Sequence, residues 1–332
     1  MSRSTIGVAA LAAALFSAPG AALACACGCG VFDVGSGTFM PSTASSGFTG
    51  WLTYNFMNQN QNWEGARAGP AADNTDKRIR TEFITLGGEY TFNPDWTLAV
   101  NLPLYDRFFT STDDGTVAGP AGGLYSAHLF AMGDLQVMAT YSGFVKDQTS
   151  GLSFGLKLPT GLYSSPVGPL GGPEFDRDTL PGTGSTDLLL GGYHLGYFDV
   201  AHRFSWFVQA RYDIAFATRD AYRPGNELDA AAGVSYDLGQ TGPFADVSVF
   251  AQMLDSWRLH DTGANADPLN SGYERVLVGP GISLTLRRVT FTGNVSIPVY
   301  QHTNAAASPS VEGTAGQLVA PELLTLQASY NF

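Results

Sequence analysis

The stretch FSWFVQARYDI, residues 204–214, has two faces of opposite chemistry when its side chains alternate as in a β-strand. The apolar face consists of Phe204, Trp206, Val208, Ala210, Tyr212 and Ile214. The other face consists of Ser205, Phe207, Gln209, Arg211 and Asp213. The alternation is as long as the roughly 9 to 11 residues that a tilted strand needs to cross a bilayer, whereas most strands of soluble proteins have about 5 or 6 residues. Because charges tolerate a wet lumen and apolar groups tolerate lipid, the stretch predicts a transmembrane strand.

The same pattern recurs along the chain. LLTLQASYNF (323–332) and VTFTGNVSIPVY (289–300) alternate as clearly as the first stretch. Further candidates of similar length are residues 47–57, 81–92, 96–105, 133–144, 152–161, 186–198, 227–238, 243–254 and 274–286. The total is about twelve, an even number as in closed bacterial barrels, and closure leaves no unpaired strand edge in lipid. The fold class predicted for residues 47–332 is therefore all-β, an outer-membrane, antiparallel up-and-down β-barrel.

The connections between these segments alternate in length. Three connections are short. Residues 93–95 (NPD) and 239–242 (GQTG) contain the turn formers Asn, Pro, Asp and Gly, and Arg287–Arg288 joins two segments directly. The stretches 107–128, 164–184, 259–273 and 302–317 are longer, polar and rich in glycine and proline. We expect the short turns in the periplasm and the long loops outside the cell. With an even strand number, both termini are then periplasmic.

The N-terminus indicates export. Arg3 precedes an apolar run over residues 6–16 that is too short to cross a bilayer, and Ala22-Leu23-Ala24 forms a small-residue cleavage pattern. Residues 1–24 therefore predict a signal peptide, followed by a Cys-, Gly- and Ser-rich leader or plug at 25–46. The whole chain has 17 basic and 29 acidic residues, a formal charge of −12, which argues against a nucleic-acid partner.

The leader contains all three cysteines of the chain at alternate positions, Cys25, Cys27 and Cys29. Three thiolates suit Cu(I), while zinc would need a fourth ligand such as the new α-amino group or Asp33. A disulfide within the leader would leave one thiol over. Acylation of Cys25 would make a lipid anchor, although Ala22 stands where such signals usually have leucine. Metal binding, redox chemistry, lipidation and no role all remain open.

Five short blocks carry a resemblance to a known family. The blocks are GDLQV (133–137), LSFGLKLPTG (152–161), GTGSTDLLLG (182–191), VGPGISLTL (278–286) and VSIPVYQ (295–301). They resemble recurring blocks of the outer-membrane transporters grouped as the MetA-pathway of phenol degradation family. The terminal SYNF is similar to the signal, ending here in Phe332, by which the assembly machinery recognises outer-membrane barrels. The resemblance implies a barrel of the same broad kind as aromatic-hydrocarbon channels in a Gram-negative outer membrane, without catalytic residues.

Signals for enzymatic chemistry are weak. The five histidines are His128, His194, His202, His260 and His302, and none accompanies a GxSxG-type nucleophile elbow. The glycines of GTGSTD fit a loop that returns to a strand. We therefore expect no enzyme and no required cofactor.

The predicted inner wall offers charged residues instead. If the apolar faces point outward, the pore-lining candidates are Lys157, Arg203, Arg211, Asp213, Glu227, Asp229, Asp237, Asp246 and Arg287. These groups either select solutes or pair with one another for stability. Pro159, Pro280 and Pro298 fall inside predicted strands and are expected to mark bulges or wall breaks.

Two functions follow from these patterns. The first is passive passage of small, hydrophobic or aromatic molecules through the barrel, with outer-membrane lipid and the barrel assembly machinery as partners. The second is handling of a soft metal ion by the cysteine leader, and a structural or adhesive barrel is a weaker third. Solute uptake that survives replacement of the three cysteines by serine favours the first, and loss of uptake favours the second.

Overall fold

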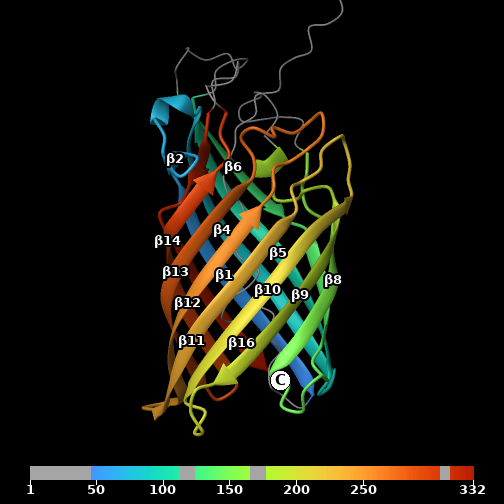
Figure 1. Ribbon diagram of the computed structural model, residues 1–332, viewed down its shortest axis with the longest axis vertical. Helices are drawn as coiled ribbons and strands as arrows, with labels where there is room; N and C mark the ends of the chain where they lie inside the picture. The colour runs from blue at the N-terminus through green and yellow to red at the C-terminus, as the bar shows by residue number, and fades with distance from the viewer. Residues whose placement is uncertain (1–45, 113–123, 165–176, 307–314) are drawn as a thin grey trace, which may run out of the picture.

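Twelve strands close into one antiparallel barrel in the computed structural model, which describes residues 46–112, 124–164, 177–306 and 315–332 (Figure 1). Each predicted segment overlaps one of these strands, so the predicted fold class and strand number are confirmed. The wall strands are β1 (Gly47–Gln59), β4 (Asp76–Asn93), β5 (Trp96–Ser111), β7 (Leu135–Tyr141), β8 (Ser150–Leu158), β9 (Thr186–Tyr197), β10 (Phe204–Ala217), β11 (Glu227–Thr241), β12 (Phe244–Arg258), β13 (Tyr273–Leu286), β14 (Val289–Thr303) and β16 (Leu323–Asn331). Among the described residues, no helix is long and apolar enough to cross a membrane.

The first and last strands close the ring. β1 pairs with β4 on one side and with β16 on the other, so that Trp51 lies opposite both Gly87 and Ser329. The Phe332 N–H donates to the Phe48 carbonyl at 3.0 Å. Both described ends of the wall therefore lie at the same end of the barrel, together with the short turns (Figure 1). We call this the turn end, and the opposite end, which carries the long connections, the loop end.

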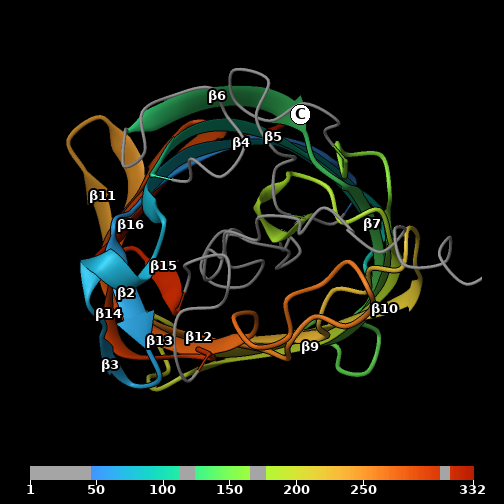
Figure 2. The same ribbon diagram turned by 90° about the horizontal axis from the view of Figure 1, so that it is seen from above.

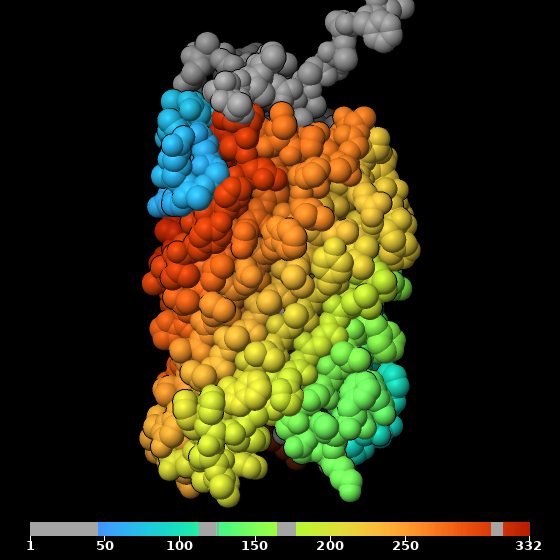
Figure 3. All heavy atoms as spheres, viewed as in Figure 1, coloured from blue at the N-terminus to red at the C-terminus, as the bar shows by residue number. Residues whose placement is uncertain are grey.

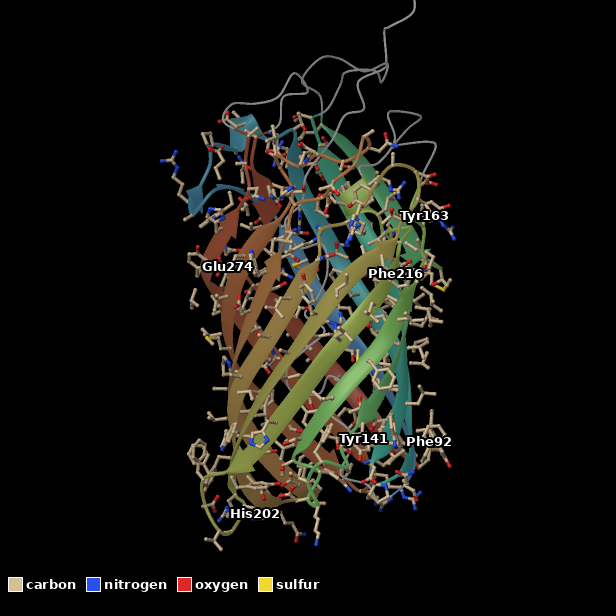
Figure 4. The ribbon with its side chains drawn as sticks, turned by 45° about the vertical axis from the view of Figure 1, so that its right-hand side comes forward. Phe92, Tyr141, Tyr163, His202, Phe216 and Glu274 are labelled. Atoms are coloured by element: carbon tan, nitrogen blue, oxygen red, sulfur yellow. The ribbon has the colours of Figure 1, made fainter. Side chains whose placement is uncertain are left out.

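The two faces of the wall have opposite polarity. Val208 and Leu326 are exposed on the outside, whereas Gln209 and Arg211 on the alternate positions of β10 are buried on the inside. In Figure 4 the aromatic side chains of Phe92 and Tyr141 lie near the turn end and Phe216 lies nearer the loop end. The outer surface between these levels is packed without interruption on the side of β10 to β13 (Figure 3). An apolar outside and a polar inside are typical of a barrel that spans a membrane.

One position of the wall is built from two strands instead of one. β5 pairs with β7 along Trp96–Asn101 and with β6 (Tyr125–Met132) along Leu104–Ser111. Gly133 and Asp134 separate β6 from β7. The predicted loop over 107–128 is therefore wrong at both ends, where the chain is strand. Arg107, the first residue of that predicted loop, has a side chain that is fully buried in the lumen.

Two of the three predicted strand prolines lie inside strands. Pro280 is in β13 and Pro298 is in β14. The pairing of these two strands shifts register between Val276 and Leu277 of β13, and Leu277 lies opposite Pro298. Pro159 follows the end of β8 at Leu158, so its predicted place inside a strand is wrong. A proline has no N–H for the ladder, which favours a strand end or a bulge over a regular position.

A small second sheet covers part of the loop end. It consists of β2 (Gln61–Glu64), β3 (Arg67–Ala68) and β15 (Gln317–Val319), next to the short helix η1 (Ala71–Asp73). The Gln59 side chain joins this sheet to the barrel by donating to the Leu318 carbonyl at 3.0 Å. Leu318 packs there against the buried Ile79 and Phe109 of the wall.

Candidate functional site in the barrel lumen

The structure separates the nine predicted pore-lining residues into two groups. Five line a cavity in the loop-end half of the lumen: Lys157, Arg211, Asp213, Glu227 and Asp229. The other four lie near the turn end: Arg203, Asp237, Asp246 and Arg287. The alternation of side chains therefore indicated the inner face, but it carried no information on height along the barrel axis.

Lys157 is the centre of the first charged network. Its ammonium group lies 2.5 Å from Asp187 Oδ2 and 2.7 Å from Asp213 Oδ2, and all three side chains are largely buried. Arg211, two residues before Asp213 on β10, donates to Gln136 Oε1 of β7 at 3.1 Å. β8, β9 and β10 bring these groups together because Lys157 lies opposite Asp187 in the ladder. The charges of this network are paired with one another, as one of the two sequence interpretations expects.

A second network closes the same cavity beside the loop end. Asp261 accepts from Arg258 at 2.5 Å, from the Tyr222 hydroxyl at 2.6 Å and from the Gly225 N–H at 2.7 Å. Glu227 accepts from Ser256 and from Tyr273, both at 2.7 Å. Burial, together with the Asp261 carboxylate, raises the pKa of the Tyr222 hydroxyl well above its ordinary value. The hydroxyl therefore stays protonated and keeps donating to Asp261.

A segment of the connection between β8 and β9 enters the lumen. It begins with the short helix η3 (Arg177–Thr179) and continues to Ser185, and we call residues 177–185 the lumen segment (Figure 2). Arg107 on β5 donates to the Thr179 carbonyl and, at 2.9 Å, to Thr81 Oγ1. Leu180 is buried and lines the cavity with Pro181. Neither Arg107 nor the lumen segment was a predicted site.

Asp134 fastens the lumen segment to the wall. Its carboxylate accepts from the N–H groups of Gly161 at 2.9 Å and of Thr183 at 2.8 Å, and from the Thr183 hydroxyl at 2.9 Å. Asp134 belongs to the two-residue interruption between β6 and β7, and its side chain is buried. The motif GDLQV pointed to this position through the family resemblance, but nothing in the sequence indicated a buried carboxylate.

The wall is discontinuous beside Asp134. In the described part of the chain, no strand pairs with the second edge of β6. At the end of this edge, the Met132 carbonyl accepts from the Leu162 N–H at 3.1 Å. Gly133, Gly161 and Gly182 cross there so closely that a Cβ on Gly161 would lie 2.7 Å from the Gly133 carbonyl carbon. The glycines thus allow three backbone segments to pass where a ladder would otherwise continue.

The inner wall also carries an apolar cluster that the polar-lumen prediction missed. We call it the inner apolar cluster, and its buried members are Met57, Phe83, Phe207, Ala231, Leu254, Leu277 and Leu323. Tyr105 packs against it, and both Tyr105 and Phe83 also line the charged cavity. The signal available in the sequence was Phe207, the single aromatic residue on the otherwise polar face of the 204–214 stretch.

The cavity has a volume of about 160 Å³. A protein cavity of about 150 Å³ is large enough for one benzene molecule. The site therefore combines a ring-sized space with a lining that contains both paired charges and apolar side chains.

The predicted metal ligands lie outside the described residues. Cys25, Cys27 and Cys29, as well as the signal peptide, precede residue 46. Within the described ranges, no group of three or more His, Cys, Asp or Glu side chains is arranged to hold a metal ion. The metal hypothesis thus stays untested.

The comparisons with known proteins give the fold. The chain is similar to the COG4313 outer membrane channel from Pseudomonas putida F1, with a TM-score of 0.62 and 12% identity over 90% of this chain and 100% of that one. The CymD monoaromatic hydrocarbon channel matches with a TM-score of 0.39 and 9% identity over 87% and 89% of the two chains. The β domain of the Bordetella autotransporter BrkA matches with a TM-score of 0.44 and 12% identity over 87% and 100%. No protein-family model and no curated protein matches the chain, so the resemblance to the MetA-pathway family stays a prediction.

Proposed function

We propose that this protein is an outer-membrane channel that passes small hydrophobic molecules, and more narrowly aromatic ones, across a Gram-negative outer membrane. The observation that carries the proposal is the inner apolar cluster, seven buried side chains on the inner wall beside a ring-sized cavity. A channel for water-soluble solutes gains nothing from such a surface, because polar solutes lose hydration against it. An apolar solute gains free energy by leaving water for the same surface.

The state of the inner charges supports the same cargo. Lys157 pairs with both Asp187 and Asp213, and Arg258 pairs with Asp261. Paired charges attract an ionic solute less than a ring of one sign does. We infer that these residues mainly hold the lumen in shape, while the apolar side chains provide the passage.

The outer surface supports a location in the outer membrane. Its exposed apolar side chains need lipid, and among the described wall strands the closed barrel leaves an unpaired edge only at β6. In the proposed orientation the turn end faces the periplasm and the loop end faces outward. The likeness to an outer membrane channel supports this assignment through its fold.

The interrupted wall gives the cargo a route. The free edge of β6, the glycine crossing and the lumen segment meet at one place, directly beside the cavity. A hydrophobic molecule that leaves the lumen there enters the membrane instead of crossing the water of the periplasm. Displacement of the lumen segment is the movement that this route requires.

The proposal is tested by uptake into intact cells that lack other hydrocarbon channels. Expression of the chain is expected to speed entry of an apolar fluorescent probe such as N-phenyl-1-naphthylamine, with little effect on entry of a sugar. The variant with Cys25, Cys27 and Cys29 changed to serine serves as the control for metal handling, and we expect its uptake to equal that of the unchanged protein. Faster sugar entry without faster probe entry would contradict the proposal, and loss of uptake in the serine variant would favour the metal hypothesis.

A further inference from the structure

In the described wall strands, the outward-facing arginines all lie on β4. In the described wall strands, Arg107, Arg211, Arg258 and Arg275 lie on the inner face, where they are largely buried. Arg78 and Arg80 of β4 alternate with the buried Ile79 and Thr81, so they face outward. For a chain with a formal charge of −12, two adjacent outward arginines are a local exception. Elsewhere on the barrel, Glu274 of β13 lies at the outer surface in the loop-end half (Figure 4).

Arg80 belongs to an ordered array that extends over three strands. Its guanidinium carbon lies 4.3 Å from the centre of the Phe108 ring, and Phe108 stacks on His128 at 4.2 Å. His128 Nε2 contacts Asp106 Oδ1 at 2.5 Å. Arg80 Nη2 lies 3.7 Å from Glu82 Oε1, beyond hydrogen-bond distance, and the side chain is partly exposed, whereas its Nε is buried. The array holds the guanidinium in place and leaves part of its hydrogen-bonding capacity unused.

Arg78 adds a second cation on the same face. Its Nε donates to Asn58 Oδ1 at 2.8 Å, which fixes the side chain from β1, and the residue is exposed. Two positioned guanidinium groups two residues apart on one strand face suit a phosphate, because a guanidinium donates two parallel hydrogen bonds to an oxyanion.

The height of the two arginines matches a lipid headgroup. The outward positions of β4 from Ile84 to Phe92 carry no charge, and this range is close to the length of about 9 residues that a tilted strand needs to cross a bilayer. On the loop-end side of that range the outward positions are Glu82, then Arg80, then Arg78, so the two arginines lie just beyond one carboxylate. On the turn-end side of the two arginines, the exposed Phe130 and Met132 of β6 form an apolar surface.

We propose that Arg78 and Arg80 form a site for a phosphorylated, multiply acylated glycolipid of the outer leaflet, of which lipid A is the general form. The phosphate binds both guanidinium groups, and the acyl chains lie over Phe130 and Met132 beside the free edge of β6. The site rests on the outer-membrane part of the proposed function, because only that orientation places β4 arginines in the outer leaflet. The bound lipid covers the wall where β6 has no partner strand among the described residues. It therefore also limits which membrane molecules reach the β6 edge.

The test measures binding of purified lipid A to the detergent-solubilised full-length protein by native mass spectrometry. The double variant Arg78→Gln/Arg80→Gln is expected to bind about tenfold more weakly or worse, the loss that one charge-assisted hydrogen bond represents. Arg219→Gln/Arg223→Gln is the matched control, since it removes the same charge from the connection between β10 and β11, and its binding is expected to stay unchanged.

Three outcomes would overturn the site. They are equal binding by the double variant, equal binding of lipid A from which the phosphates have been removed, and equal binding of phosphatidylglycerol. Uptake of the apolar probe is measured on the same variants. Normal uptake without lipid A binding removes only this inference, whereas absence of uptake in the unchanged protein removes the proposed function.

Discussion

Lys157→Met is expected to lower the free energy of unfolding of the barrel by about 3–5 kcal/mol. The substitution removes the cation that lies 2.5 Å from Asp187 and 2.7 Å from Asp213, and it leaves both carboxylates buried. Methionine has a similar length, so the change removes the charge with little change in volume. Urea unfolding of the refolded barrel, followed by its heat-modifiable mobility on gels, measures the difference.

Two further variants show whether the charge is the cause. Lys146→Met removes a lysine from the exposed turn between β7 and β8 and is expected to have no effect. The triple variant Lys157→Met/Asp187→Asn/Asp213→Asn removes the whole charged group, and we expect it to recover part of the lost stability. Wild-type stability in the single variant would show that the network does not hold the lumen together.

Asp134→Ala is expected to release the lumen segment and to raise the ion conductance of the channel several-fold. The substitution removes the acceptor for two backbone N–H groups and one hydroxyl, from Gly161 and Thr183. A hydrogen bond to a charged group contributes about 1.5–3 kcal/mol. Loss of the two Thr183 bonds leaves the segment held by Arg107, by the Gly182 N–H on the Leu162 carbonyl and by the Arg177–Asp220 ion pair. Single-channel recording in planar bilayers measures the conductance, and limited proteolysis between residues 177 and 185 measures the release.

The control carboxylate is Asp147, which accepts from the Thr149 hydroxyl at 2.9 Å in an exposed turn. Asp147→Ala removes a comparable hydrogen bond at the turn end and is expected to leave conductance and cleavage unchanged. Asp134→Asn keeps one acceptor oxygen and is expected to lie between the wild type and Asp134→Ala. A closed, protease-resistant channel in Asp134→Ala would show that other contacts fasten the segment.

The barrel was predictable from the sequence because its signal is local. In residues 204–214, the alternation alone gives the two faces, and in the structure Val208 is exposed while Gln209 and Arg211 are buried. The number of strands followed from the same alternation in the other segments of the chain. Each strand contributes this information without reference to its neighbours.

The site was less predictable because it depends on contacts between distant segments. Arg107 looked like a loop residue, and only the lumen segment, more than 70 positions later, explains its burial. The interruption at Gly133 and Asp134 is likewise visible only when Gly161 and Gly182 cross beside it. Phe207 appeared as one aromatic residue on a polar face, and six other strands are needed to show that it belongs to a cluster.

The central claim is that apolar molecules pass along the inner apolar cluster, and uptake by the double variant Phe207→Asn/Leu254→Asn tests it most directly. Ser235→Asn adds an amide to the same inner wall outside the cluster and serves as the control, and heat-modifiable mobility verifies that all three proteins are folded. The account predicts that apolar-probe uptake falls several-fold in the double variant and stays unchanged in Ser235→Asn. Undiminished uptake in a folded double variant would contradict it.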